Sequence, residues 1–339
     1  MSAAGNPCLV VPLAVSFRSS LVSLAGGKRE RPAPTTSPKS HAFSSRLFVS
    51  TDGLDPVGLS GFIPPEIYVL GLLEDLTIID ETIGGSLPKQ FGTNATNIRQ
   101  LVIQGTQLGG SIPFAYLENS PIESLLLNSN RIGGTIPFEI GSIPTLEELD
   151  LSGNELSGTV PGGLVRYSSL NTLAVDSNRL QGSIPTGIYA MPNLQRLHVN
   201  DNELMDGSLD PAIGAMESLQ GLRVGRTGIG GTVPDELFSL GNLVELDLRN
   251  AAFVGGLSSA FSNLGTTLQQ LYLQENAFTG TVPEAFGALT RLTALALEGN
   301  NLEGSIVPEI CVLLLDGALD DLSVDCDEVQ CSCCTECFR

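Results

Sequence analysis

Hydrophobic residues recur along most of the chain with a period of 24 or 25 residues. In the copy that begins at Leu146, Leu149 and Leu151 lie two residues apart, and later apolar residues follow at gaps of three to five. The first spacing is typical of one face of a short strand, and the later gaps fit neither a strand nor a helix. A fixed period of this length predicts a solenoid. Its units begin at Leu73, Ile98, Ile122, Leu146, Leu170, Leu194, Leu219, Leu243, Leu268 and Leu292.

A single unit is too small to fold alone. Ordering its backbone costs roughly 1 to 2 kcal/mol per residue, whereas each buried apolar side chain returns roughly 1.5 to 3 kcal/mol. Stacked units share one apolar interior and pair their strands, so stability becomes a sum over neighbouring interfaces. We therefore expect one elongated domain, although a chain of 339 residues usually forms two.

Polar and turn residues recur at fixed positions of the unit. At the ninth residue, a buried amide can bond the backbone of its own turn and of the next coil. The asparagines that form this ladder are Asn130, Asn154, Asn178, Asn202, Asn276 and Asn300. A glycine that marks a tight turn follows four residues later, as at Gly158. A proline comes three residues after the glycine, as at Pro161, and we expect it where a strand ladder lacks a donor.

Units such as LNTLAVDSNRLQGSIPTGIYAMPN (170–193) resemble the plant-type leucine-rich repeat, and the Gly-x-Ile-Pro element makes the subclass specific. The resemblance implies an α/β-type solenoid of about 11 coils: a right-handed horseshoe with a concave parallel β-sheet and convex loops or 3-10 turns. It also implies extracellular recognition, as in receptor ectodomains and polygalacturonase-inhibiting proteins. The Trp- and Cys-containing N-terminal cap that is usual in the family is missing here.

Charge and composition narrow the class of partner. The formal net charge is −20, and residues 1–46 are basic, so the rest of the chain carries a net charge near −25. Such a surface repels nucleic acid and anionic membranes, so we expect neither as a partner. No stretch reaches 18 apolar residues, so we expect no membrane-spanning segment.

Six of the seven cysteines lie in the last 29 residues, and Cys8 lies alone near the N-terminus. They predict a disulfide-bonded C-terminal cap over residues 325–339, with a connectivity that the sequence leaves open. The alternative is a zinc site made by the last four. The six candidates are Cys311, Cys326, Cys331, Cys333, Cys334 and Cys337.

The chain divides into a leader at 1–46, the solenoid at 47–324 and the cap. The leader has no apolar period, so we expect disorder, and three explanations of it remain open: a secretory signal, an organelle transit peptide and an incorrect start codon. We expect an extracellular or cell-surface location, or an organelle if the leader is a transit peptide. Asn94 heads the single glycosylation triplet.

Three units depart from the pattern. The unit at Leu194 carries an extra residue near Met205 and Asp206, the unit at Leu243 has Ala251 at the asparagine position, and the unit at Leu73 has Glu81 there. We interpret them as drift of the repeat, with a local change of curvature as the alternative.

The third, fifth and seventh residues of each unit alternate with the inward leucines, so they point to the concave surface. Five cations from three successive units gather on this map, and Arg can bind an anionic group with two hydrogen bonds. We predict a recognition patch for an acidic ligand, the alternative being a face on which the arginines pair with neighbouring carboxylates. The candidate residues are Asp150, Asp176, Arg196, His198, Arg223, Arg226, Asp247, Arg249 and Tyr272.

Catalysis has little support in the sequence. His198 with Asp176 and Ser152 would form a triad only across separate strands of an open face, so we expect no enzyme, cofactor or metal. The function predicted is a recognition module that binds a protein, peptide or glycan on the concave face. The alternatives are an inhibitor of a wall-degrading enzyme and an adhesive matrix protein.

Overall fold

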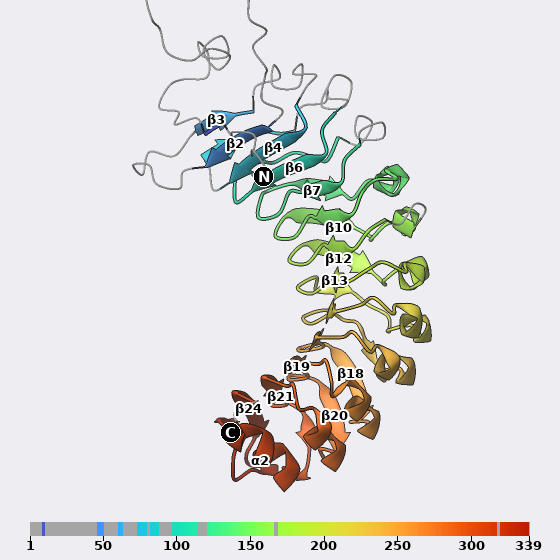
Figure 1. Ribbon diagram of the computed structural model, residues 1–339, viewed down its shortest axis with the longest axis vertical. Helices are drawn as coiled ribbons and strands as arrows, with labels where there is room; N and C mark the ends of the chain where they lie inside the picture. Colours follow the sequence, from blue (N-terminus) through green and yellow to red (C-terminus); the bar gives the residue numbers. More distant parts are fainter. Residues whose placement is uncertain are drawn as a thin grey trace, which may run out of the picture.

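The chain forms a curved stack of coils in the computed structural model (Figure 1). The structure describes residues 9–10, 46–50, 60–63, 73–79, 82–87, 97–113, 121–165, 169–316 and 319–338. Within the predicted leader these include only Leu9, Val10 and Arg46, and Asn94 and Cys8 lie outside the described residues.

A parallel sheet of 14 strands follows the inner side of the arc, as predicted (Figure 1). Each strand lies one coil from the next, so that Leu149 faces Leu125 on one side and Leu173 on the other. The strands in spatial order are β1 (Leu9–Val10), β2 (Arg46–Ser50), β4 (Asp75–Ile79), β6 (Gln100–Gln104), β7 (Ser124–Leu126), β9 (Glu148–Asp150), β11 (Thr172–Ala174), β13 (Arg196–His198), β15 (Gly221–Arg223), β17 (Glu245–Asp247), β19 (Gln270–Tyr272), β21 (Ala294–Ala296), β24 (Asp321–Asp325) and β26 (Glu336–Phe338).

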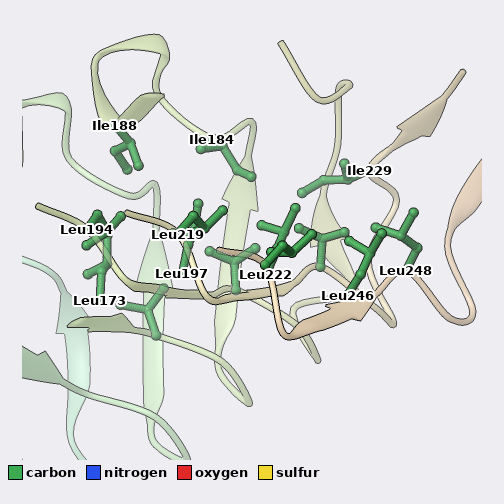
Figure 2. Close-up of a cluster of buried hydrophobic side chains, with 14 of the residues drawn as sticks. Leu173, Ile184, Ile188, Leu194, Leu197, Leu219, Leu222, Ile229, Leu246 and Leu248 are labelled. Atoms are coloured by element: carbon green, nitrogen blue, oxygen red, sulfur yellow. The ribbon is translucent and has the colours of Figure 1, made fainter. Parts of the chain in front are cut away.

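The leucines of the repeat form one continuous interior. Leu149 and Leu173 are fully buried, and Leu197, Leu222 and Leu246 continue the row through the next coils (Figure 2). Fully burying one such side chain stabilises the fold by roughly 1.5 to 3 kcal/mol. The shared interior explains why the coils must stack.

Short 3-10 helices follow the outer side of the arc (Figure 1). They are η3 (Phe138–Ser142), η4 (Gly162–Val165), η5 (Thr186–Ala190), η6 (Pro211–Ala215), η7 (Asp235–Ser239), η8 (Ser259–Leu264) and η9 (Glu284–Ala288). Pro137, Pro185, Pro234 and Pro283 precede four of them, and the carbonyl of Pro137 accepts a hydrogen bond from the N–H of Ile140. Our explanation of the prolines was therefore wrong: they begin the convex turns, because their φ near −60° suits a helix start.

A second set of short parallel sheets flanks the main one, and we did not predict it. One consists of β8 (Gly133–Thr135), β10 (Glu155–Gly158), β12 (Arg179–Gly182) and β14 (Leu204–Met205), and another of β16 (Gly230–Gly231), β18 (Ala252–Gly256), β20 (Ala277–Gly280) and β22 (Asn301–Leu302). Two pairs lie nearer the ends: β3 (Ser60–Phe62) with β5 (Thr82–Gly84), and β23 (Gly304–Ser305) with β25 (Val329–Gln330). The break between β14 and β16 lies at the irregular unit that begins at Leu194, where the extra residue shifts the register.

Three disulfides hold the C-terminal end together, which confirms that these cysteines are oxidised. They join Cys311 of α2 (Pro308–Leu315) to Cys333, Cys326 to Cys337, and Cys331 to Cys334. The four cysteines of the alternative zinc site are therefore all disulfide-bonded and supply no thiolate to a metal. Cys337 lies in β26, which pairs with β24 and so covers the last coil of the sheet.

Candidate functional site

Residues of the concave face form rows across the main sheet. In the row of third residues, Glu148, Thr172, Arg196, Gly221 and Glu245 are successive partners. In the row of fifth residues the order is Asp150, Ala174, His198, Arg223, Asp247 and Tyr272. The stacking therefore brings the predicted cations of three coils onto one face.

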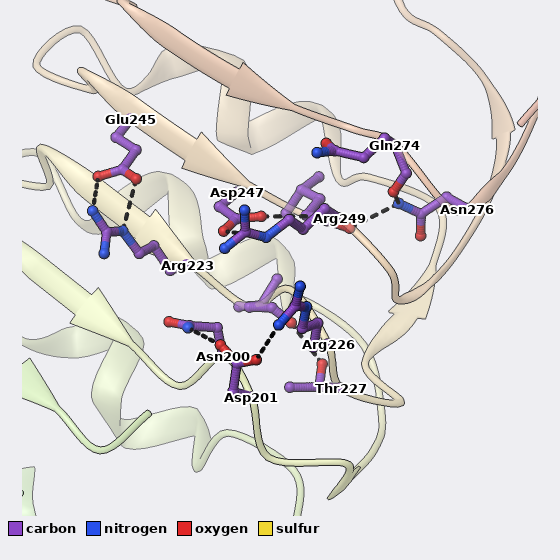
Figure 3. A network of polar contacts seen from close by, with 12 residues as sticks. Asn200, Asp201, Arg223, Arg226, Thr227, Glu245, Asp247, Arg249, Gln274 and Asn276 are labelled. Atoms are coloured by element: carbon purple, nitrogen blue, oxygen red, sulfur yellow. Dashed lines mark hydrogen bonds and ion pairs between the residues drawn. The ribbon is translucent and has the colours of Figure 1, made fainter. Parts of the chain in front are cut away.

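Three of the five predicted cations are paired with carboxylates (Figure 3). Arg223 donates two hydrogen bonds to Glu245, of 2.7 and 2.9 Å, and these raise the pKa of its guanidinium. Arg226 lies 3.2 Å from Asp201, and Arg249 lies 3.3 Å from Asp247. For these three arginines the geometry is that of a charge-balanced face.

Arg196 and His198 differ from these three. Arg196 is exposed, and its row partners Thr172 and Gly221 carry no charge. His198 has its pKa lowered to about 4, first by burial and then by the charge of Arg223, so it is neutral near pH 7. Arg196 is therefore the predicted cation that the described contacts leave without a carboxylate.

The predicted acidic residues lie in two environments. Asp247 is 1% exposed, and burial raises its pKa although the backbone N–H of Arg249 donates to it. Asp150 accepts hydrogen bonds from the N–H and hydroxyl of Ser152. Burial, with the nearby charge of Asp150, raises the pKa of Asp176 to about 6. Asp176, the seventh residue of its unit, is therefore only partly ionised near pH 6.

Tyr272 completes the predicted set. The guanidinium of Arg249 lies 5.8 Å from the centre of its ring, within the range of a cation–π contact. Burial raises the pKa of the Tyr272 hydroxyl. Tyr272 thus supports Arg249 and closes one end of the cluster.

The geometry offers little to catalysis. The Ser152 hydroxyl donates to Asp150, in its own coil, rather than to His198. Among the residues that the structure describes, no group of His, Cys, Asp or Glu is placed to hold a metal ion. The Ser152 hydroxyl of the imagined triad is therefore engaged within its own coil.

The asparagines of the ninth position form a continuous ladder. Asn154 accepts from the N–H of Ile132 in the preceding coil and donates to the carbonyls of Leu127, Leu151 and Ser152. The same pattern is found at Asn178, Asn202, Asn276 and Asn300. Asn130 donates to the carbonyls of Ile103 and Leu127 but accepts from the hydroxyl of Thr106 instead of a backbone N–H.

Two further residues hold the ninth position of their units, and sequence reasoning missed them; we call the residues at this position the ninth-position file. Thr106 and Thr227 hold the ninth position of their units, and each accepts a 3.2 Å hydrogen bond from a backbone N–H two residues on. Thr227 also donates to the carbonyl of Val224. A hydroxyl in the asparagine column was the signal that could have identified them.

Comparisons with known proteins agree with this geometry. Family models described as "Leucine rich repeat" match residues 242–302 and residues 145–166. No curated protein sequence matches the chain. Within the described residues, no helix is long and apolar enough to cross a membrane.

Three solved structures have folds similar to that of this chain. The plant peptide hormone receptor RGFR1 in complex with RGF2 is 31% identical, with a TM-score of 0.72 over 79% of this chain and 43% of that chain. The ectodomain of the membrane receptor kinase GASSHO1/SCHENGEN3 from Arabidopsis thaliana is 26% identical, with a TM-score of 0.73 over 86% and 38%. A plant ice-binding protein is 26% identical, with a TM-score of 0.51 over 62% and 74%.

This chain spans less than half of the length of the two receptor chains. Within that span it shares their repeat pattern, their parallel sheet and their overall fold. The chain is therefore a leucine-rich repeat solenoid of the type found in plant receptor ectodomains.

Proposed function

We propose that this chain is an extracellular recognition module that binds a peptide on its concave face, with Arg196 as the anchor for an anionic group of the ligand. The two similar receptors are described in complex with RGF2 and with CASPARIAN STRIP INTEGRITY FACTOR 2. Three disulfides favour an oxidising compartment.

The unpaired state of Arg196 carries the proposal. Arg223, Arg226 and Arg249 already have carboxylate partners, so a ligand would have to compete for them. Arg196 is exposed between two uncharged row partners, Thr172 and Gly221, and the space over Gly221 is shared by the stem of Arg196, the ring of His198 and the carboxylate of Glu245, which bonds Arg223. A guanidinium in this setting can form two hydrogen bonds to one carboxylate or sulfate.

The test is binding of a pool of synthetic ten-residue peptides, some bearing a free carboxylate or a sulfated tyrosine and others fully capped. We expect Arg196→Glu to weaken binding of the anionic members at least tenfold. Arg179→Glu is the matched control, because Arg179 lies on β12 of the flank and pairs with Glu155 at 3.2 Å. Equal losses in both variants would show a general charge effect and contradict the proposal.

A second candidate function is supported by the flank of the solenoid. One exposed hydroxyl residue follows the turn glycine in nearly every coil, and no charged residue takes its place although the protein is acidic. We call these residues the hydroxyl file: Ser86, Ser111, Thr135, Thr159, Ser183, Ser208, Thr232, Thr281 and Ser305.

The glycines set the regularity of the hydroxyl file. Gly158 has φ +79°, and a β-carbon there would come within 3.0 Å of the Thr135 methyl group. Gly304 is related in the same way to Thr281, at 3.1 Å. Neighbouring strands repeat at about 4.8 Å. The result is a rigid, uncharged array that suits a periodic surface, and a similar solved structure is that of a plant ice-binding protein.

Ice binding is tested by thermal hysteresis and by inhibition of ice recrystallisation. If the hydroxyl file binds ice, Thr135→Glu with Thr159→Glu abolishes both effects, because two charges interrupt the array. Thr172→Glu on the concave face is the control and leaves them unchanged. Absence of ice activity in the unmodified protein would exclude this second function without touching the first.

A further inference from the structure

Unsatisfied polar atoms gather in one file of the concave face. Within the described part of the chain, four buried side-chain atoms have no hydrogen-bond partner. Three of them are Asn200 Oδ1, Arg249 Nε and Gln274 Oε1, and all three residues hold the seventh position of their units. The fourth is the hydroxyl of Tyr189, on the convex helix η5.

Asn200 is held with its carbonyl oxygen unpaired. The residue is only 7% exposed, and its amide nitrogen donates a 2.6 Å hydrogen bond to Asp201 Oδ2 (Figure 3). This bond fixes which end of the amide is the nitrogen, so Oδ1 is the atom left over. A buried acceptor without a partner costs about 1 to 3 kcal/mol.

Arg249 also has unused hydrogen-bonding capacity. Its Nε lies 3.3 Å from Asp247 Oδ2, close enough for charge attraction, yet the two atoms are not aligned for a hydrogen bond. The side chain leans over Gly225, where a β-carbon would come within 2.9 Å of Arg249 Cγ. Asp247 Oδ1 would lie 2.7 Å from the same β-carbon, so Gly225, the seventh residue between Asn200 and Arg249, provides the space that the stem of Arg249 and the carboxylate of Asp247 occupy.

The polarity along this file alternates. Asn200 and Gln274 offer acceptors, and Arg249 between them offers a donor. Three steps between strands separate Asn200 from Gln274, or about 14 Å at 4.8 Å per strand. Four residues of an extended peptide cover nearly the same length, at about 3.3 to 3.4 Å each. Residues that are an even number apart direct their N–H and C=O groups to the same edge of such a peptide.

We propose that Asn200, Arg249 and Gln274 form a subsite for the main chain of an extended ligand segment. In this subsite Asn200 Oδ1 and Gln274 Oε1 accept from the N–H groups of ligand residues four apart, and Arg249 Nε donates to a carbonyl between them. The atoms are covered in the free protein, so the side chains turn to another staggered rotamer when the ligand arrives. The inference rests on the proposed concave binding function and adds the register of the ligand.

The experiment begins with the tightest fully capped, uncharged ten-residue peptide from the pool described above. Each of its backbone amides is methylated in turn, which removes one N–H donor at a time. We expect losses in affinity of about tenfold or more, the equivalent of about 1.4 kcal/mol, at two positions four residues apart. Methylation at the intervening positions has a smaller effect.

Variants of the protein provide the second arm. Gln274→Met keeps the length of the side chain but removes the acceptor, so it lowers affinity about tenfold and leaves the melting temperature unchanged or higher. Gln104 is the matched control, since it is also a seventh-position glutamine but its amide donates to Asn128 at 2.7 Å. Gln104→Met therefore preserves affinity and lowers stability.

The outcomes separate the subsite from the wider proposal. Anionic peptides that respond to Arg196→Glu, together with a methylation scan and a Gln274→Met variant that change nothing, would overturn the subsite and keep the concave binding function. A pool without any binding member would overturn both. Gln274→Met and methylation of one ligand amide each lower the affinity. If the two changes together cost less than the sum of their separate effects, the contact between that amide and Gln274 is confirmed.

Discussion

Asn200 and Asn202 lie two residues apart in the same coil, yet their amides have opposite fates. Asn202 is fully buried, accepts from the N–H of Leu180 and donates to the carbonyls of Val175 and Val199. Asn200 makes one side-chain hydrogen bond, to Asp201, and its oxygen has none. The same side chain therefore stabilises the fold at one position and carries an unmet hydrogen bond at the other.

The two files extend this difference over many coils. The ninth-position file is satisfied wherever an asparagine or threonine occupies it, because each amide joins its own turn to the preceding coil. The seventh-position file contains the unpaired atoms of Asn200, Arg249 and Gln274 and the carboxyl of Asp176, whose pKa is raised to about 6. The ninth-position file therefore stabilises the fold, and the seventh-position file offers the hydrogen-bonding groups that a ligand can use.

The largest effect that tests this contrast is expected for Asn202→Ala. The variant leaves the N–H of Leu180 and two buried carbonyls with fewer partners, so we expect a loss of about 3 to 4 kcal/mol in the free energy of unfolding. Urea unfolding of Asn200→Ala, expected to lose less than about 1 kcal/mol, is the comparison. Equal losses at the two positions would contradict the division between the files.

Much of the fold could be predicted because the period of 24 or 25 residues repeats the same inward leucines. The flanking sheets could not, since strands such as Gly230–Gly231 are short, rich in glycine and without alternation. The partners of the arginines also could not, because a long side chain reaches several carboxylates and packing decides between them. Arg226 with Asp201 is such a pair.

The candidate site shows a sharper limit of sequence reasoning. Gln104 and Gln274 are the same residue type at the same, seventh position of their units. Gln104 finds Asn128 in the next coil, whereas Gln274 Oε1 finds no partner. Whether a polar group is satisfied depends on its neighbours in three dimensions, so the unmet file could be recognised only in the structure.

A smaller effect is expected from acidification. The folded pKa of Asp176 is raised above its ordinary value of 3.8 to about 6, so the folded state binds more protons between these pH values. Through this group stability therefore rises as the pH falls from 6 towards 4, by roughly 1 kcal/mol after allowance for solvent screening. The Asp176→Asn variant should lack this contribution when the free energy of unfolding is measured between pH 4 and 7.

His198 acts in the opposite direction over nearly the same range. Its folded pKa is lowered to about 4, so the unfolded chain binds more protons below pH 6.5 and stability falls on acidification. The two slopes partly cancel in the unmodified protein. A pH dependence that is identical in the unmodified protein and in Asp176→Asn would mean that the concave carboxyl is not strained.

The smallest effect is expected at Ala251, where the ninth-position file lacks an asparagine. Ala251 holds the ninth position of the unit at Leu243, and the N–H of Ile229, which an asparagine there would satisfy, is bonded by Thr227 at 3.2 Å instead. Ala251→Asn restores the missing amide, so we expect a gain of about 0.5 to 1 kcal/mol in the free energy of unfolding. The same exchange at Ala174, on the concave face, is the control and brings no gain, because no backbone groups wait for an amide there. A loss of stability at Ala251 would mean that the coils around the break in the flanking sheet no longer accept the geometry of the repeat.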